Sequence, residues 1–138
     1  MSYINNPSPG SVTPGMIREE LTADRTYYVR TDGSNSNTGL ANTSGGAFLT
    51  IQYAADVVAF DIDIQGYHVV IRVADGTYNE DVSLNACVGL RASPSLLSEP
   101  YGFVAIIGND TTPANCISNS AFGVNFDAVG PNAIWMVT

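Results

Sequence analysis

One amphipathic helix between two strands, followed only by short strand candidates, limits the possible folds of this chain most. Residues 26–31 and 68–73 are rich in β-branched and aromatic side chains, which predicts two strands. Between them, residues 48–59 predict a short helix with Thr50 as its N-cap. Its apolar face has the spacing i, i+3, i+4 and i+7 and consists of Ile51, Ala54, Ala55 and Val58. We therefore expect the helix to cap the end of a longer β structure.

The remainder of the chain divides into short strand candidates separated by Gly, Pro, Asn, Asp and Ser. These candidates are residues 80–85, 88–92, 103–107, 115–118, 123–126 and 133–137. A spacing near ten residues is typical of a sandwich or barrel. However, the Asp-Gly pairs at 32–33 and 75–76 precede no matched return strand, so hairpins are disfavoured. A parallel β-helix, in which short strands stack in successive coils, fits the pattern better.

The two ends of the chain indicate contacts with partners. Residues 1–24 predict an extended attachment arm, because prolines and glycines between 2 and 15 exclude a helix or a central strand. In this arm, Tyr3, Ile4 and Val12 provide apolar contacts for an oligomer interface, although an unattached terminus is an equal alternative. Residues 25–138 predict the capped domain. Its last strand carries a further candidate interface formed by Ile134, Trp135, Met136 and Val137, unless the polypeptide continues and covers it.

Composition excludes several classes of function. The 138 residues carry a net charge of −8, and all basic residues are arginine, so nucleic-acid binding is not expected. An anionic membrane surface would repel the chain, and no apolar stretch approaches the ~20 residues that span a bilayer. Cys87 and Cys116 are too few and too distant for a metal motif, so we expect free thiols. No cofactor is predicted.

The polar loop at residues 32–47 raises the question of a metal. Asp32, Ser34 and Ser36 alternate oxygen-bearing side chains before Gly39, which is a feature of calcium loops. The further carboxylates of such loops are missing. We therefore favour a turn that hydrogen-bonds to itself and keep calcium as an alternative.

The central stretch resembles a known family. The sequences Tyr-Tyr-Val-Arg-Thr-Asp-Gly-Ser-Asn-Ser-Asn-Thr-Gly-Leu at 27–40, Gly-Ala-Phe-Leu-Thr-Ile-Gln at 46–52 and Val-Ala-Asp-Gly-Thr-Tyr at 73–78 carry the resemblance. They are similar to the opening of right-handed parallel β-helix proteins of the pectin-lyase-like group, especially phage and prophage tail-spike or tail-fibre proteins. The resemblance covers residues 22–118 and implies a mainly β fold. That fold would be a short right-handed solenoid with one N-terminal capping α-helix.

The same resemblance implies a function. We expect a virion structural protein, a tail-spike or tail-fibre-like component for particle attachment and adhesion to a host-surface glycan. It would form a homotrimer, bind other virion proteins through residues 1–24, and be made in the host cytoplasm without a signal peptide. The alternatives are the N-terminal part of a polysaccharide-degrading lyase, hydrolase or esterase, or a capsid decoration module.

No catalytic residue is predicted, and an enzyme is disfavoured without being excluded. Glycosidases need two carboxylates about 5–9.5 Å apart, but adjacent strand residues such as Glu80 and Asp81 point to opposite faces. Asp61 and Asp63 follow the helix, where a solvated turn explains them, and His68 has no nucleophilic partner in a recognisable pattern. Four aromatic residues are candidates for glycan or partner contact: Tyr101, Phe103, Phe122 and Trp135.

Overall fold

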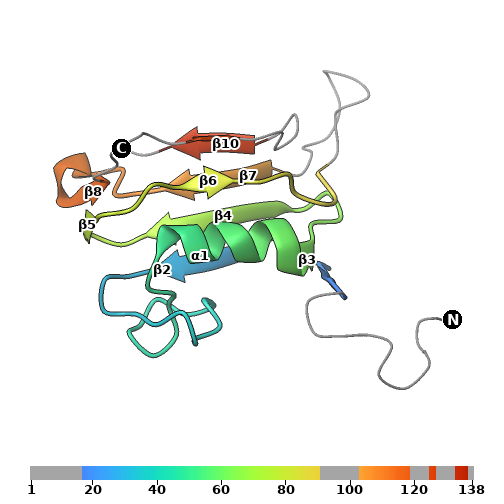
Figure 1. The fold of residues 1–138 in the computed structure, drawn as a ribbon, viewed down its shortest axis with the longest axis horizontal. Helices are drawn as coiled ribbons and strands as arrows, with labels where there is room; N and C mark the ends of the chain where they lie inside the picture. Colours follow the sequence, from blue (N-terminus) through green and yellow to red (C-terminus); the bar gives the residue numbers. More distant parts are fainter. Residues whose placement is uncertain (1–16, 91–102, 119–124, 127–132, 137–138) are drawn as a thin grey trace, which may run out of the picture.

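A four-stranded parallel sheet is the largest element of the protein. The computed structural model describes residues 17–90, 103–118, 125–126 and 133–136. The strands lie in the order β10-β7-β4-β2 (Figure 1). Their bounds are β2 Arg25–Val29, β4 His68–Val73, β7 Phe103–Ile107 and β10 Ala133–Met136. Residues of β4 alternate in exposure, with Val69, Ile71 and Val73 buried, so the sheet has one core face and one outer face.

Three two-stranded parallel sheets flank the large one. They pair β1 Glu19–Glu20 with β3 Ile62–Asp63, β5 Gly76–Tyr78 with β8 Cys116–Ser118, and β6 Ser83–Leu84 with β9 Asn125–Phe126. A 3-10 turn, η2 Pro113–Asn115, precedes β8. Every strand pairing among the described residues is parallel, so each neighbour is reached by a crossover and never by a hairpin.

The helix forms where the apolar spacing predicts it. The helix α1 Ile51–Asp56 continues directly into a π-helical turn, η1 Val57–Asp61. Thr50 is the N-cap, and its hydroxyl accepts a hydrogen bond from the backbone N–H of Tyr53 at 3.1 Å. Gln52 anchors the helix to β6, because its amide exchanges two hydrogen bonds with the backbone of Ser83, at 2.7 and 3.0 Å.

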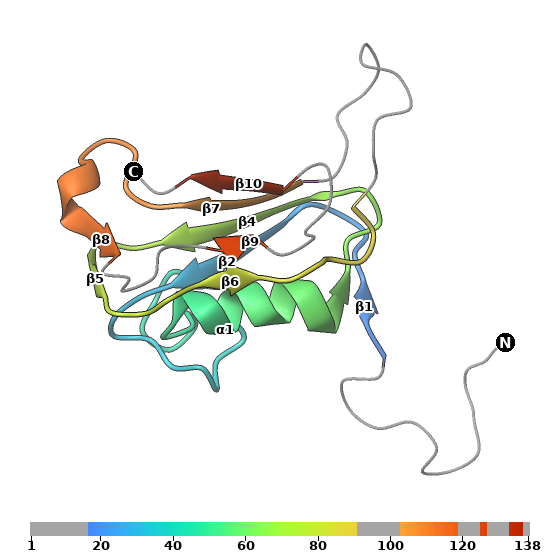
Figure 2. The ribbon, with the colours of Figure 1, turned by 45° about the horizontal axis from the view of Figure 1, so that its top comes forward.

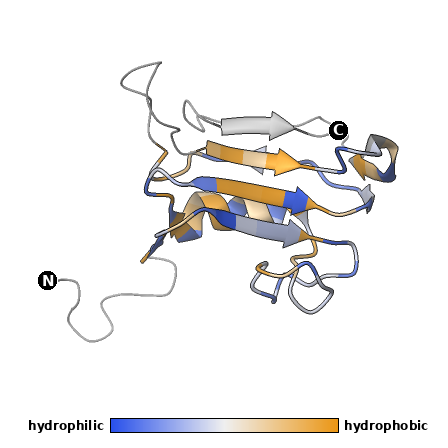
Figure 3. Cartoon of the chain, turned by 180° about the vertical axis from the view of Figure 1, so that it is seen from behind, coloured by the Kyte–Doolittle hydropathy of each residue, from blue (hydrophilic) through white to orange (hydrophobic). Residues whose placement is uncertain are grey.

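The hydrophobic core lies between the helix and the large sheet. Figures 1 and 2 show α1 along one face of the sheet, beside β6. Ile51, Ala54, Ala55 and Val58 are buried on the helix side. The sheet contributes Tyr27, Val29, Val69, Ile71, Val104 and Ile106, which belong to the same cluster. Figure 3 views the molecule from the opposite side and shows the hydrophobic stretches that run through β4 and β7.

The prediction of a mainly β, right-handed parallel β-helix with a capping helix is wrong. The structure is a small mixed domain, in which short strands form small parallel sheets beside one short helix. The physical reason lies in the helix. Its apolar face packs along the face of the large sheet, so the core is a layer between helix and sheet and not the interior of a stack of coils. Outside the large sheet the paired strands are only two or three residues long.

The two edges of the large sheet differ. Along β2, the chain covers its own edge, because Phe48 donates to the carbonyl of Tyr28 and accepts from Arg30, both at 2.9 Å. The N–H of Tyr28 donates to the Gly39 carbonyl at 2.8 Å. At the other edge, no strand within the described ranges pairs with β10 beyond β7. One edge is therefore closed by a loop, and on the other β10 has no second strand partner among the described residues.

A candidate ligand cleft at the ends of the central strands

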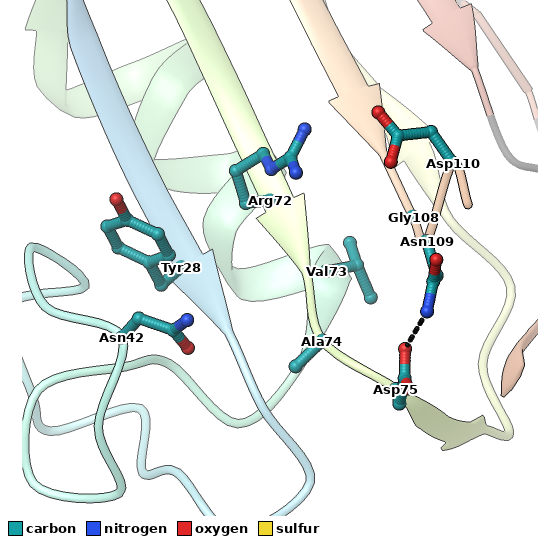
Figure 4. Close-up of a pocket in the computed structure, with 9 residues that line it drawn as sticks. All are labelled: Tyr28, Asn42, Arg72, Val73, Ala74, Asp75, Gly108, Asn109 and Asp110. Carbon is teal, nitrogen blue, oxygen red and sulfur yellow. Dashed lines mark hydrogen bonds between the residues drawn. The ribbon is translucent and has the colours of Figure 1, made fainter. Parts of the chain in front are cut away.

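A polar cleft lies where β2, β4 and β7 end at their carboxyl termini. Its volume is about 270 Å³, at the small end of ligand sites, and Figure 4 shows its walls. The lining residues are Tyr28, Asn42, Arg72, Val73, Ala74, Asp75, Gly108, Asn109 and Asp110. The carboxyl ends of parallel strands are the usual place for ligands in open sheets of this kind.

The floor of the cleft comes from two neighbouring strands. Tyr28 in β2 and Arg72 in β4 are register partners, so their side chains stand next to each other on the outer face. The flanking residues Tyr27, Ile71 and Val73 are buried on the core face. Packing of these neighbours fixes the strands and therefore the backbone positions from which the Tyr28 and Arg72 side chains project.

Arg72 is exposed and uncommitted. Within the parts of the chain that the structure describes, its guanidinium makes no hydrogen bond or ion pair. Each of the other described arginines is engaged. Arg18 donates to the Ala59 carbonyl at 2.7 Å, Arg25 pairs with Glu19 at 2.6 Å, and Arg30 pairs with Asp32 at 2.7 Å.

The other walls are loops held by hydrogen bonds. Asn109 donates from Nδ2 to Asp75 at 2.8 Å, which links the loop after β7 to the loop after β4. The Asn109 Oδ1 accepts from the backbone of Thr111 and Thr112 at 2.9 and 2.7 Å. Asn42, on the third wall, accepts from Arg30 at 3.2 Å. The cleft therefore presents an aromatic ring from Tyr28, a cation from Arg72, and amide and carboxylate groups from the surrounding loops.

Two of the carboxylates named in the sequence analysis, Glu80 and Asp63, have structural partners. Glu80 accepts hydrogen bonds from the backbone N–H groups of Ile51 and Gln52 at 3.0 and 2.8 Å. Asp63 accepts two hydrogen bonds from Gln65, at 3.2 Å from its backbone and 3.0 Å from its side chain. Asp61 is exposed beside the second, separate hollow that Tyr27 lines.

His68 and the two cysteines have the following surroundings. His68 stacks on Phe103 with ring centroids 4.3 Å apart, and its Nδ1 lies 3.5 Å from the carboxylate of Asp24. Cys87 and Cys116 are free thiols. Burial raises the pKa of the Cys87 thiol to about 11, so it is protonated at neutral pH.

The predicted contact residues are only partly described. Phe103 lies in β7, half-buried against His68. In β10, the backbone of Ile134, Trp135 and Met136 pairs with residues 105–107 of β7. Six further residues of the predicted glycan and interface sets lie outside the described residues: Tyr3, Ile4, Val12, Tyr101, Phe122 and Val137.

The oxygen-rich loop is stabilised by its own side chains. Asp32 is ion-paired with Arg30, which holds the pKa of that carboxyl below its usual value, and the hydroxyls of Ser34 and Ser36 lie 2.8 Å apart. Asn35 accepts from the backbone of Leu49 and Thr50 at 2.9 and 3.2 Å. Over the described part of the chain, no three His, Cys, Asp or Glu residues gather in a way that could hold a metal ion.

Sequence reasoning missed the cleft, although one signal for it exists. Arg72 is the only charged residue in the apolar strand 68–73, and strand alternation places it on the face opposite Ile71. The partners Tyr28, Asn42 and Asn109 lie up to 81 positions apart in sequence and meet only through the strand register.

Comparison with known proteins finds no matching family model, no matching curated protein and no matching solved structure. Among the described residues, no helix has the length and apolar character required to cross a membrane.

Proposed function

We propose that the chain is a structural component of a phage particle, of the tail-spike or tail-fibre class, that adheres to a host-surface glycan. The sequence motifs at 27–40, 46–52 and 73–78 support the virion context through their resemblance to that class. The observation that carries the adhesive role is the cleft, in which an aromatic ring and an uncommitted guanidinium stand together on a rigid sheet.

The chemistry of the cleft suits a sugar. A sugar has an apolar C–H face, which packs on an aromatic ring such as that of Tyr28, and a rim of hydroxyl groups. Hydroxyls both donate and accept, so they need donors such as Arg72 and Asn42 and acceptors such as Asp75. The cleft contains all these groups within one small volume.

Binding is favoured over catalysis by the positions of the other acidic groups. Both oxygens of Glu80 are used at the start of α1, and both oxygens of Asp63 are used by Gln65. A trimer attached through residues 1–24 remains part of the proposal. The outer edge of β10, which no described strand covers, supports a partner, because exposed sheet edges are usually covered.

The variant Arg72→Gln tests the adhesive role. We expect the purified chain to bind defined glycans on an array, and we expect this substitution to weaken binding by about tenfold or more, since a charge-assisted hydrogen bond contributes roughly 1.5–3 kcal/mol. The matched control is Arg25→Gln. It also removes one arginine charge, but Arg25 is the first residue of β2 and lies outside the cleft. Equal binding by both variants and the parent chain would contradict a role for the cleft.

A further inference from the structure

We infer that the cleft binds a sugar unit that carries a carboxylate, with the carboxylate placed on Arg72. This inference rests on the proposed adhesion to a glycan and specifies the class of that glycan. It follows from three features of the cleft: the free guanidinium, the acidic opposite wall and the adjacent ring.

The free guanidinium selects an anionic group of matching shape. Arginine donates in a planar fork, which fits the two oxygens of a carboxylate. In a chain of net charge −8, the other described arginines contact a carboxylate or backbone carbonyls, whereas Arg72 has no such contact with any residue that the structure describes. A ligand carboxylate supplies a partner that none of the described residues gives to Arg72.

The opposite wall sets the orientation of the ligand. Asp75 and Asp110 line it, and Asp75 is held in place by Asn109. Carboxylates accept hydrogen bonds from hydroxyl groups but repel a second anion. The ligand therefore directs its carboxylate toward β4 and its hydroxyls toward the loops at 74–75 and 108–110. A compact anion without hydroxyl donors satisfies only one side of the cleft.

The ring and the volume limit the size of the ligand unit. Tyr28 stands beside Arg72 in register, and its backbone is hydrogen-bonded to Gly39 and Phe48, so the ring has a fixed base. A cleft of about 270 Å³ accommodates a small unit, which favours one sugar residue of a longer glycan over an extended segment.

Two pairs of small glycosides test the inference by nuclear magnetic resonance titration of the full chain. The methyl glycosides of glucuronic and galacturonic acid are compared with methyl glucoside and methyl galactoside, which carry a hydroxymethyl group at C6 in place of the carboxylate. We expect at least one acidic glycoside to bind about tenfold more tightly than its neutral counterpart. The variant Arg72→Gln should remove this difference, Arg25→Gln should preserve it, and Tyr28→Leu should weaken acidic and neutral forms alike. Spectra of the free variants check that each one is folded.

The possible failures can be told apart. Equal binding of acidic and neutral glycosides, reduced by Tyr28→Leu, would overturn the acidic class but leave glycan adhesion intact. Inorganic phosphate binding as tightly as the best acidic glycoside would also overturn the inference, because a general anion site would explain it. If none of the four glycosides changes the resonances of the cleft residues, the inference is overturned. The proposed adhesion then also loses the site on which it depends.

Discussion

Replacing Ile71 with alanine is expected to lower the free energy of unfolding by about 2–5 kcal/mol. Ile71 is fully buried in β4, the strand that lies between β2 and β7. Its register partners on the core face are Tyr27 and Ile106, which are also buried. Truncation leaves a cavity in the centre of the layer between sheet and helix. Urea denaturation followed by circular dichroism measures the change.

The neighbouring residue provides the control. Val70 lies on the same strand, but its side chain is on the outer face and only half-buried. The variant Val70→Ala is therefore expected to cost about 1 kcal/mol or less. Equal losses for the two variants would contradict the assignment of core and outer faces to the large sheet.

Replacing Glu80 with alanine is expected to cost about 2–4 kcal/mol, because two charge-assisted hydrogen bonds are lost at once. The carboxylate accepts hydrogen bonds from the backbone N–H groups of Ile51 and Gln52. These groups have no hydrogen-bond partner within the first turn of α1. It also places a negative charge at the positive end of the helix dipole. The same contact joins the segment after β5 to the start of the helix. Thermal and urea unfolding both report the loss.

Two matched variants separate this contact from a general effect of charge. Glu20→Ala removes an exposed carboxylate in β1 and is expected to change stability by at most about 0.5 kcal/mol. Glu80→Gln keeps the side-chain length but lacks the charge, so we expect an intermediate loss. A Glu80→Ala variant as stable as Glu20→Ala would show that the helix start does not depend on this carboxylate.

Local patterns predicted several elements of the fold. The strand predicted at 68–73 is β4 His68–Val73, and the strand predicted at 103–107 is β7 Phe103–Ile107. The helix begins at Ile51 with Thr50 as its N-cap, as predicted. Gly76, the first residue of β5, adopts a φ of +147°, a conformation that side chains with a Cβ rarely adopt. Each of these features depends on residues close together in sequence.

The arrangement of these elements could not be predicted in the same way. The pattern of short strands and polar turns does not specify how many strands join one sheet, nor which face the helix covers. Those choices depend on contacts such as Gln52 with Ser83 and Glu80 with Ile51, which join residues about 30 positions apart. The helix could therefore be placed in the sequence, but its position along the sheet face could not.

The cleft could not be predicted from the sequence for a similar reason. Arg72 could be identified as a charged residue in an apolar strand, but only the folded chain shows that no other described residue pairs with it. Tyr28 and Arg72 become neighbours through the parallel register of β2 and β4, and Asp75 and Asn109 through the packing of two loops. The sequence analysis placed the aromatic contacts later in the chain, at Tyr101, Phe103, Phe122 and Trp135.

Labelling of native phage particles tests the proposed function most directly. Gold-conjugated antibodies raised against the purified chain are imaged on intact particles by electron microscopy. We predict labels at the tail or its appendages. We predict no labels when the antibodies are first absorbed with an excess of the free chain. Labels distributed over the capsid lattice, or particles without any label, would contradict a tail-spike or tail-fibre protein.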